Sequence, residues 1–171
     1  MLNFCSLYSG SSGNSLFIET ENTKVLVDIG LSCKKIEEAL ASIEESPNSI
    51  DAILITHEHS DHIKGLSTIS HKFDIPVFAT RETFDAMPLQ TEKISNKNIN
   101  YFSPNEKFNI NDLEITPFSI PHDAANPCGF TINNSKHQLS IATDIGHMTN
   151  DIVKHLEGSE LLLLESNYDI E

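Results

Sequence analysis

Three histidines and an aspartate lie within one short segment, directly after a run of apolar residues. The segment is Thr56-His57-Glu58-His59-Ser60-Asp61-His62, and it follows Ala52-Ile53-Leu54-Ile55. Imidazole and carboxylate groups are the ligands of zinc, manganese and iron sites in proteins. α/β proteins place their chemistry where a buried strand runs into a loop. On such a loop one pair of these side chains can face one metal ion while the other pair faces a second, so the motif predicts a dinuclear metal site.

Three further polar residues follow predicted strands, namely Asp28, His122 and Asp144. They meet the histidine segment only if their strands are neighbours that end at one common edge. Taken singly, His122 also fits a core or surface histidine, and Asp144 also fits a capping residue of a turn. The segment of residues 56–62 is called the metal loop below. For Asp28 we expect hydrogen bonds to the backbone of this loop rather than a bond to metal.

The expected ligands form two sets joined by one carboxylate, because two neighbouring cations need shared negative charge and a carboxylate has two oxygen atoms. Two divalent ions are therefore expected, and ligands of nitrogen and oxygen alone fit zinc, manganese or iron. The first set is His57, His59 and His122, the second is Asp61 and His62, and Asp144 bridges them.

Hydrophobic patterning predicts an α/β (α+β) chain in which strands alternate with helices. Residues 161–164 are expected to form a last buried strand, and residues 89–98 a surface loop. The other expected strands are 3–9, 15–20, 24–28, 51–56, 75–79, 113–120, 129–132 and 139–143. Helices are expected from residue 32 for about a dozen residues, over 63–73, from 80 to before Pro88, and over 149–156.

Composition narrows the functional classes. The formal net charge of −14 argues against a nucleic-acid binder with a broad basic surface, but not against a nuclease whose metal ions hold the phosphate. The three cysteines are scattered along the chain, and we expect them to be small buried residues of a protein in the reducing cytosol. The longest apolar run, Leu161–Leu164, is far too short to span a membrane, and the N-terminus does not read as a signal peptide. We therefore expect a cytoplasmic protein that does not act in a membrane.

On these residues the chain resembles the metallo-β-lactamase superfamily. The matching elements occur in the family's order and include the complete H-x-H-x-D-H signature. Three shorter motifs resemble the YycJ/WalJ branch, whose members are bacterial cytosolic proteins similar to DNA exonucleases. The superfamily elements are Val27-Asp28-Ile29-Gly30, His57/His59/Asp61/His62, His122 and Thr143-Asp144; the branch motifs are Ser9-Gly10-Ser11-Ser12-Gly13-Asn14-Ser15, Pro121-His122-Asp123-Ala124 and Glu165-Ser166-Asn167.

The resemblance implies an αββα sandwich built of two similar halves, with the last metal histidine in the second half. Residues 1–171 are then expected to be the N-terminal portion of a single domain, with the C-terminal half absent and the second metal shell incomplete. Such a half sandwich would expose apolar faces at residues 139–143 and 161–164. We therefore expect a homo-oligomer formed through the exposed sheet.

The resemblance and the ligand set together imply a metal-dependent hydrolase, with a phosphodiesterase or 5′-exonuclease acting on DNA as the favoured reading. A metal-bridged hydroxide would attack phosphorus, and Asp61 would be the catalytic residue that orients it. The Gly10–Ser15 segment is either a plain turn or a source of backbone N–H groups for a phosphate. One alternative is a hydrolase of thioesters, lactones or β-lactams at the same site, and another is a metal-binding regulatory module without turnover.

Overall fold

The computed structural model describes residues 1–165. Its first β-sheet combines antiparallel and parallel strands. The strand order is β1-β2-β3-β4-β5-β6, antiparallel from β1 to β3 and parallel from β3 to β6. The parallel strands therefore end at the same edge of the sheet. The bounds are β1 Asn3–Tyr8, β2 Ser15–Glu19, β3 Lys24–Val27, β4 Ala52–Leu54, β5 Val77–Ala79 and β6 Ile99–Tyr101.

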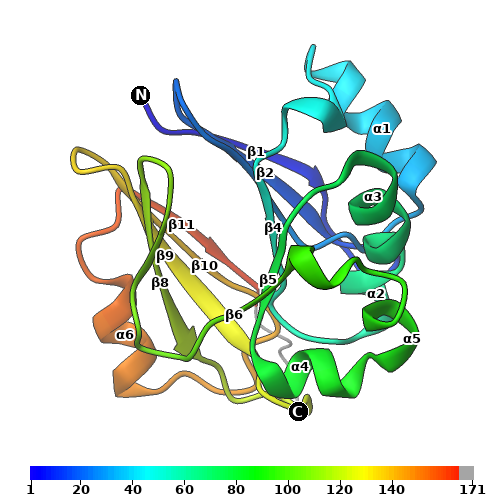
Figure 1. Ribbon diagram of the computed structural model, residues 1–171. Helices are drawn as coiled ribbons and strands as arrows, with labels where there is room; N and C mark the ends of the chain where they lie inside the picture. Colours follow the sequence, from blue (N-terminus) through cyan, green and yellow to red (C-terminus); the bar gives the residue numbers. More distant parts are fainter. Residues whose placement is uncertain (166–171) are drawn as a thin grey trace.

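The second sheet has the order β11-β10-β9-β8-β7 and packs face to face on the first (Figure 1). Its strands are antiparallel except for the parallel pair β10 and β11. The bounds are β7 Phe108–Ile110, β8 Leu113–Ser119, β9 Cys128–Asn133, β10 Gln138–Ala142 and β11 Leu161–Leu164.

Helices cover the outer faces of both sheets, so the fold is the expected αββα sandwich (Figure 1). Thr80 and Thr149 cap α4 and α6 by accepting hydrogen bonds from backbone N–H groups, as threonine does at helix starts. None of the helices within residues 1–165 is long and apolar enough to cross a lipid bilayer. Helices on the first sheet are α1 Cys33–Ser42, α2 Ser60–Ile63, α3 Leu66–Phe73, α4 Arg81–Ala86 and α5 Pro88–Thr91, with 3₁₀ turns η1 Pro47–Ser49 and η2 Asn96–Asn98; α6 Asn150–Leu156 lies on the second sheet.

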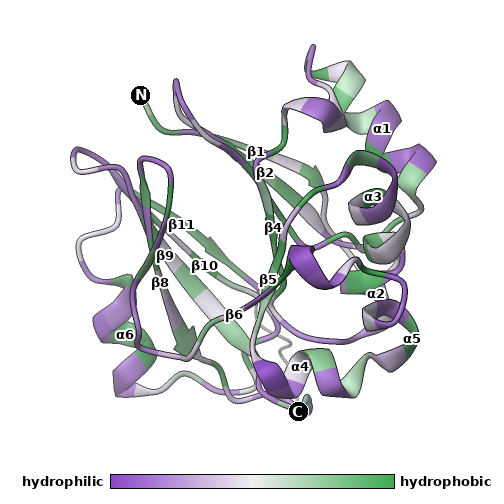
Figure 2. Cartoon of the chain, in the orientation of Figure 1, coloured by the Kyte–Doolittle hydropathy of each residue, from purple (hydrophilic) through white to green (hydrophobic). Residues whose placement is uncertain are grey.

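Successive side chains of the central strands enter two different cores. Val25 and Val27 of β3 point into the layer between the sheets, whereas Leu26 points toward the helices. All three are fully buried. Because a strand covered on both faces has no solvent side, its sequence is a continuous apolar run rather than an alternating one. Figure 2 shows this as hydrophobic colour along the strands between the layers.

Two expectations about the second sheet are wrong. Strand β11 forms, but it lies at the edge of the sheet, and Leu161, Leu162 and Leu164 are each more than 40% exposed. The expectation of a buried strand is therefore wrong, whereas the expectation of an apolar face exposed at residues 161–164 is confirmed. Strand β10, expected to expose an apolar face, lies between β9 and β11 and is buried at Leu139 and Ile141. Self-association through the exposed edge remains a prediction that gel filtration would test.

Two expectations about the helical layer also need correction. The helix expected over residues 63–73 is divided into α2 and α3 at Gly65, where a Cβ atom would overlap the carbonyl oxygen of Leu31. The segment 89–98 is not a plain surface loop, because it contains part of α5 and the turn η2. Ile94 and Asn98 in this segment are almost fully buried, so it is part of the packed structure.

The cysteines form no disulfide and differ in burial. Cys33 and Cys128 are buried, and Cys5 is half-buried. Burial raises the pKa of the Cys33 thiol to about 11 and that of Cys128 to about 12. Since the thiolate is the reactive form, a disulfide reagent at pH 8 is expected to modify Cys5 first in the native protein. All three thiols should react in guanidinium, and fast native labelling of Cys128 would contradict the burial described here.

Candidate metal centre

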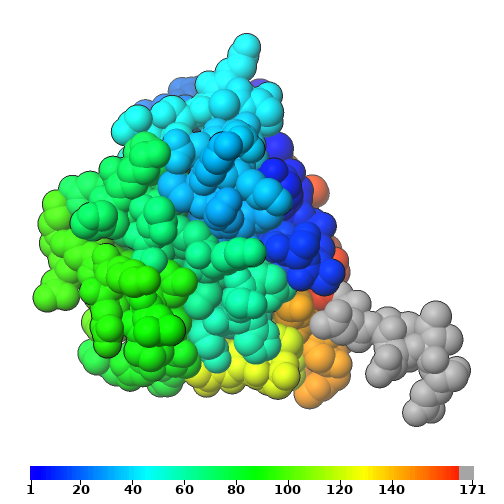
Figure 3. Space-filling model, turned by 90° about the vertical axis from the view of Figure 1, so that its right-hand side faces the viewer, coloured from blue at the N-terminus to red at the C-terminus, as the bar shows by residue number. Residues whose placement is uncertain are grey.

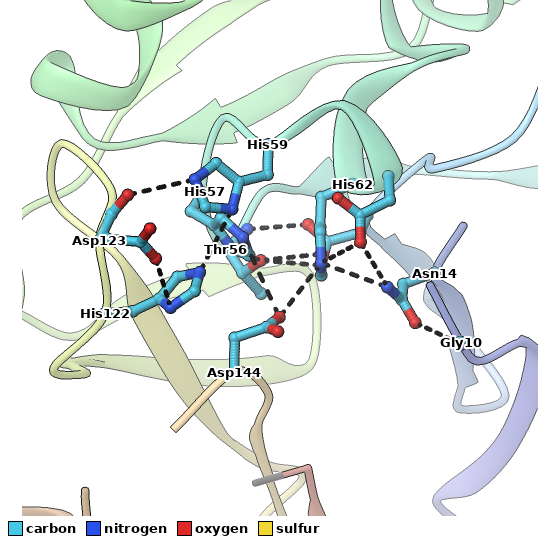
Figure 4. A network of polar contacts seen from close by, with 11 residues as sticks. Gly10, Asn14, Thr56, His57, His59, His62, His122, Asp123 and Asp144 are labelled. Carbon is cyan, nitrogen blue, oxygen red and sulfur yellow. Dashed lines mark hydrogen bonds and ion pairs between the residues drawn. The ribbon is translucent and has the colours of Figure 1, made fainter. Parts of the chain in front are cut away.

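The candidate ligands come together at one end of the sandwich, from segments that follow three strands (Figure 4). The segment after β4 contributes His57, His59 and His62, the last from α2. His122 follows β8, and Asp144 follows β10. The site therefore lies among the loops that follow β4 of the first sheet and β8 and β10 of the second. The sequence predicted that these strand ends would converge.

The first group consists of three imidazoles. His57, His59 and His122 each offer one nitrogen atom, and these atoms all lie within 4.8 Å of one another. Nε2 of His122 is 3.2 Å from Nδ1 of His59. The rings meet nearly edge to face, so their nitrogen atoms converge rather than stack. This arrangement could hold one metal ion.

The second group adjoins the first because His57 belongs to both. It consists of His57, His62 and Asp144, again with ligand atoms within 4.8 Å of one another. Oδ2 of Asp144 lies 3.2 Å from Nε2 of His62 and 4.0 Å from Nε2 of His57. Asp61 is at the margin, with Oδ2 3.5 Å from Nε2 of His62, and is outside both groups of three. The shared role of His57 and the marginal place of Asp61 differ from the simple division expected from sequence.

The outer nitrogen atoms of three imidazoles face oxygen acceptors. Nδ1 of His62 contacts Oδ2 of Asp28 at 2.8 Å. Asp123 contacts the outer nitrogen atoms of the other two imidazoles. Its carbonyl oxygen lies 3.2 Å from Nε2 of His59, and its carboxylate lies 3.1 Å from Nδ1 of His122. A ring nitrogen that faces such an oxygen donates its proton, so in a neutral imidazole the opposite nitrogen keeps a free electron pair. The inner nitrogen atoms are thus prepared to bind a cation, as in known metal sites.

Asp28 holds the start of the metal loop through hydrogen bonds to Thr56. Its Oδ1 accepts a hydrogen bond from the backbone N–H of Thr56 at 2.9 Å, as expected from sequence, and its Oδ2 accepts one from the Thr56 hydroxyl at 2.8 Å. Asp28 has a φ of 62° and Asp144 a φ of 55°, in the left-handed region that aspartate tolerates better than most residues. Sparsely populated backbone conformations of this kind cluster at functional sites.

Two buried atoms of the centre lack hydrogen bonds to the described residues. They are Nε2 of His57 and Oδ2 of Asp144. A buried polar atom left without a partner costs about 1–3 kcal/mol. A divalent cation between these atoms would bind both, so the residues present fit such an ion. The donors are all nitrogen or oxygen, which suits zinc, manganese or iron.

The protonation of the imidazoles agrees with this assignment. Burial lowers the pKa of His57 to about 4, helped by the charge of His62, so His57 is neutral at pH 7 and its nitrogen is available to a cation. Burial also opposes charge on His62, but the carboxylates of Asp28 and Asp144 outweigh it and raise the pKa of His62 to about 10. Positive charge is therefore favoured between these two carboxylates, whether a proton or a metal ion carries it.

Sequence reasoning missed two supporting residues. One is Asp123, whose backbone oxygen reaches His59 across 63 intervening residues. The other is Asn14, whose side chain accepts a hydrogen bond from the backbone N–H of Gly10 at 3.0 Å and lies 3.2 Å from Nε2 of His62. Asn14 thereby ties the Gly10–Ser15 segment to the centre. In the sequence, each is marked only by its place in a motif that resembles the YycJ/WalJ branch.

The remaining histidines lie outside both groups. His155 stacks on Phe118, with ring centroids 4.8 Å apart, and His137 contacts Glu160 at 2.9 Å. His71 and His147 are exposed. Within residues 1–165, no group of three possible ligands includes any of these four.

Two curated proteins with sequences similar to this chain are both named exodeoxyribonucleases. The chain is 38% identical over 170 residues to an exodeoxyribonuclease YycJ of Bacillus anthracis, covering 99% of this chain and 64% of the relative. It is 36% identical to an exodeoxyribonuclease WalJ of Streptococcus pneumoniae, covering 96% of this chain and 62% of the relative. The chain thus spans less than two thirds of the length of these relatives.

Solved structures share the fold at low sequence identity. The metallo-β-lactamase fold protein YhfI of Bacillus subtilis superimposes with a TM-score of 0.75 at 15% identity, covering 95% of this chain and 70% of that one. Zinc-bound PqqB of Methylobacterium extorquens gives 0.73 at 18% identity, covering 89% and 59%. The family model described as the beta-lactamase superfamily domain matches residues 23–171. With its αββα sandwich and its His/Asp cluster at the loop ends, the chain belongs to the β-lactamase superfamily domain family.

Proposed function

We propose that this protein is a metal-dependent hydrolase that cleaves phosphodiester bonds of DNA, acting as an exonuclease. The observation that carries the proposal is the pair of adjoining ligand groups that share His57. Two adjoining groups suit two cations, and paired cations are typical of phosphatases and nucleases. The names of the YycJ and WalJ relatives support DNA as the substrate. A DNA substrate also fits the cytoplasmic location expected from the sequence.

We assign the ligands as follows. His57, His59 and His122 would hold one ion; His62, Asp144 and Asp61 would hold the other, with Asp144 facing both groups. When bound, zinc or manganese at such a pair of sites activates water at neutral pH and stabilises the charge of the reacting phosphate.

We propose that Asp61 orients the attacking water. Its carboxylate is about one-third exposed, so it faces both the centre and the solvent from which water and substrate arrive. Nδ2 of Asn14 lies 3.4 Å from Oδ2 of Asp61 and can donate to it, which restricts the carboxylate to one orientation. A fixed carboxylate that accepts a hydrogen bond from water aims the oxygen lone pair at phosphorus and takes up the proton.

Asp123 is proposed to position two imidazoles of the first group. Its carboxylate is 88% exposed, so replacing it by alanine removes the contact with His122 without opening a buried cavity. Loss of such an orienting group typically weakens metal binding 10- to 100-fold. Asp123→Ala should therefore weaken the binding of the ion assigned to His57, His59 and His122 by about 10- to 100-fold in competition with a chelating dye. Asp151→Ala, which removes an exposed carboxylate on α6, is the control and should bind metal as the wild type does. Equal affinities for Asp123→Ala and Asp151→Ala would contradict this role.

A substrate panel tests the reaction itself. The metal-loaded protein is offered end-labelled duplex DNA, bis-p-nitrophenyl phosphate, a thioester and nitrocefin. We expect mononucleotides from the DNA and hydrolysis of the small diester. The same ligand groups would serve attack on a carbonyl carbon, so turnover of the thioester or nitrocefin alone would overturn the proposal in favour of a carbonyl hydrolase. Tight metal binding with no turnover of any substrate would favour a regulatory module.

A further inference from the structure

Arg81 and Tyr101 form an exposed pair near the candidate metal centre. Arg81 is the chain's single arginine, and its Cζ lies 4.4 Å from the centroid of the Tyr101 ring. The ring is 51% exposed. Within residues 1–165 the structure shows no ion pair and no hydrogen bond of the guanidinium group. Its donors are therefore available to a ligand.

The tyrosine ring is held in place from the protein side. Phe84 of α4 is almost fully buried and meets Tyr101 edge to face, with ring centroids 5.5 Å apart. The backbone of Tyr101 pairs with Ala79 in the parallel ladder between β5 and β6. An aromatic ring fixed in this way presents a rigid apolar surface to solvent. A rigid surface loses little conformational entropy when a planar ligand stacks on it.

The pair lies at the same edge of the sheet as the metal loop. The loop follows β4, Arg81 follows β5, and Tyr101 ends β6, and these three strands are adjacent and parallel. Neighbouring strands are about 4.8 Å apart, so the end of β6 is about 10 Å from the end of β4.

Side-chain contacts connect this region to the centre. Nδ2 of Asn126 donates to the carboxylate of Glu82 at 3.3 Å, and the backbone N–H of Ala125 donates to the carboxylate of Glu58 at 2.8 Å. The loop that carries His122 thus bridges α4 and the metal loop. Figure 3 shows the surface of the α4 region, in green, meeting this loop, in yellow, without an intervening segment.

We propose that Arg81 and Tyr101 form a docking site for an unpaired DNA strand whose scissile linkage lies at the metal centre. The inference rests on the proposed function and adds the form of the substrate. Nucleobases stack on exposed aromatic rings regardless of their sequence, and a guanidinium group pairs with phosphate oxygens. A net charge of −14 excludes capture by a broad basic surface, so a local arginine with a stacking ring suits this protein. At 3.4 Å per nucleotide, 10 Å corresponds to about three nucleotides of a stacked strand.

Fluorescence anisotropy with metal-loaded protein and a labelled single strand tests the site. Phosphorothioate linkages keep the strand intact, so binding is read separately from hydrolysis. Arg81→Gln and Tyr101→Ala should each weaken binding at least about fivefold, the lower range for loss of one base-stacking contact. Tyr101→Phe keeps the ring and should bind within about twofold of wild type. Lys136→Ala removes an exposed charge from the turn between β9 and β10, at the end of the second sheet opposite to the His122 loop, and should also bind within about twofold.

The result can overturn the proposal in several ways. Unchanged binding by Arg81→Gln overturns it, and this variant alters an exposed side chain whose loss should leave thermal unfolding unchanged. An equal loss in Lys136→Ala would show a general charge effect rather than a site. A blunt duplex of the same length should lose less affinity in Tyr101→Ala than the single strand does, because its bases are already stacked; an equal loss would overturn the preference for an unpaired strand. Failure of the DNA hydrolysis assay with intact binding would reject the proposed function and the scissile linkage at the metal centre, but would still support strand binding by Arg81 and Tyr101.

Discussion

Replacing Asp61 by alanine is expected to slow DNA hydrolysis by about 10²- to 10⁴-fold, the usual loss when an oriented acid–base group is removed. Its carboxylate lies beside His62 but outside the three-imidazole group, so the ion assigned to that group should remain bound. The fold should persist, because the contacts of Asp61 with the Gly10–Ser15 segment include its backbone oxygen, which accepts from Asn14 in any variant.

Two comparisons make the Asp61 experiment decisive. Asp61→Asn keeps the size and one oxygen acceptor but cannot take up a proton, so it should lose most of the activity while retaining metal. Asp151→Ala, on the exposed face of α6, is the matched surface control and should hydrolyse DNA as the wild type does. If Asp61→Ala kept its rate within about threefold of wild type, the role given to this carboxylate would be wrong.

His59→Ala is expected to lose at least one equivalent of bound metal and with it the hydrolytic activity. His59 lies only in the group with His57 and His122, and its Nδ1 is 3.2 Å from Nε2 of His122, so its removal leaves two ligands for that ion. Elemental analysis after dialysis measures the loss. His71→Ala removes an exposed histidine of α3 and should keep the wild-type metal content. Equal metal content in His59→Ala and wild type would refute the ligand assignment.

The strands of the fold could be predicted because their signals are local, whereas the layered αββα arrangement was implied only by the family resemblance. The continuous apolar runs of β3 and β4 indicate strands covered on both faces, and each is buried on both faces in the structure. Edge positions could not be predicted in this way. The leucines of β11 look like a buried strand in sequence, but their exposure depends on which neighbours a strand has in the sheet, and periodicity does not encode that.

In the candidate metal centre, too, some features could be predicted from the sequence and others could not. The spacing of the histidine segment and the polar residues at strand ends place the side chains correctly at one edge. The position of the His57 ring between both groups depends on side-chain rotation, which spacing does not fix. The contact between Asp123 and His59 depends on the path of a distant loop, so it could not be predicted from residue spacing.

Dependence of DNA hydrolysis on bound metal tests the central claim most directly. The protein is stripped with a chelator, zinc or manganese is added back in steps, and release of mononucleotides from an end-labelled strand is measured against bound equivalents. Two adjoining sites that act together predict almost no release up to one equivalent and a steep rise between one and two. Release by the metal-free protein, or full release at one equivalent, would contradict a centre in which both groups hold an ion during the reaction.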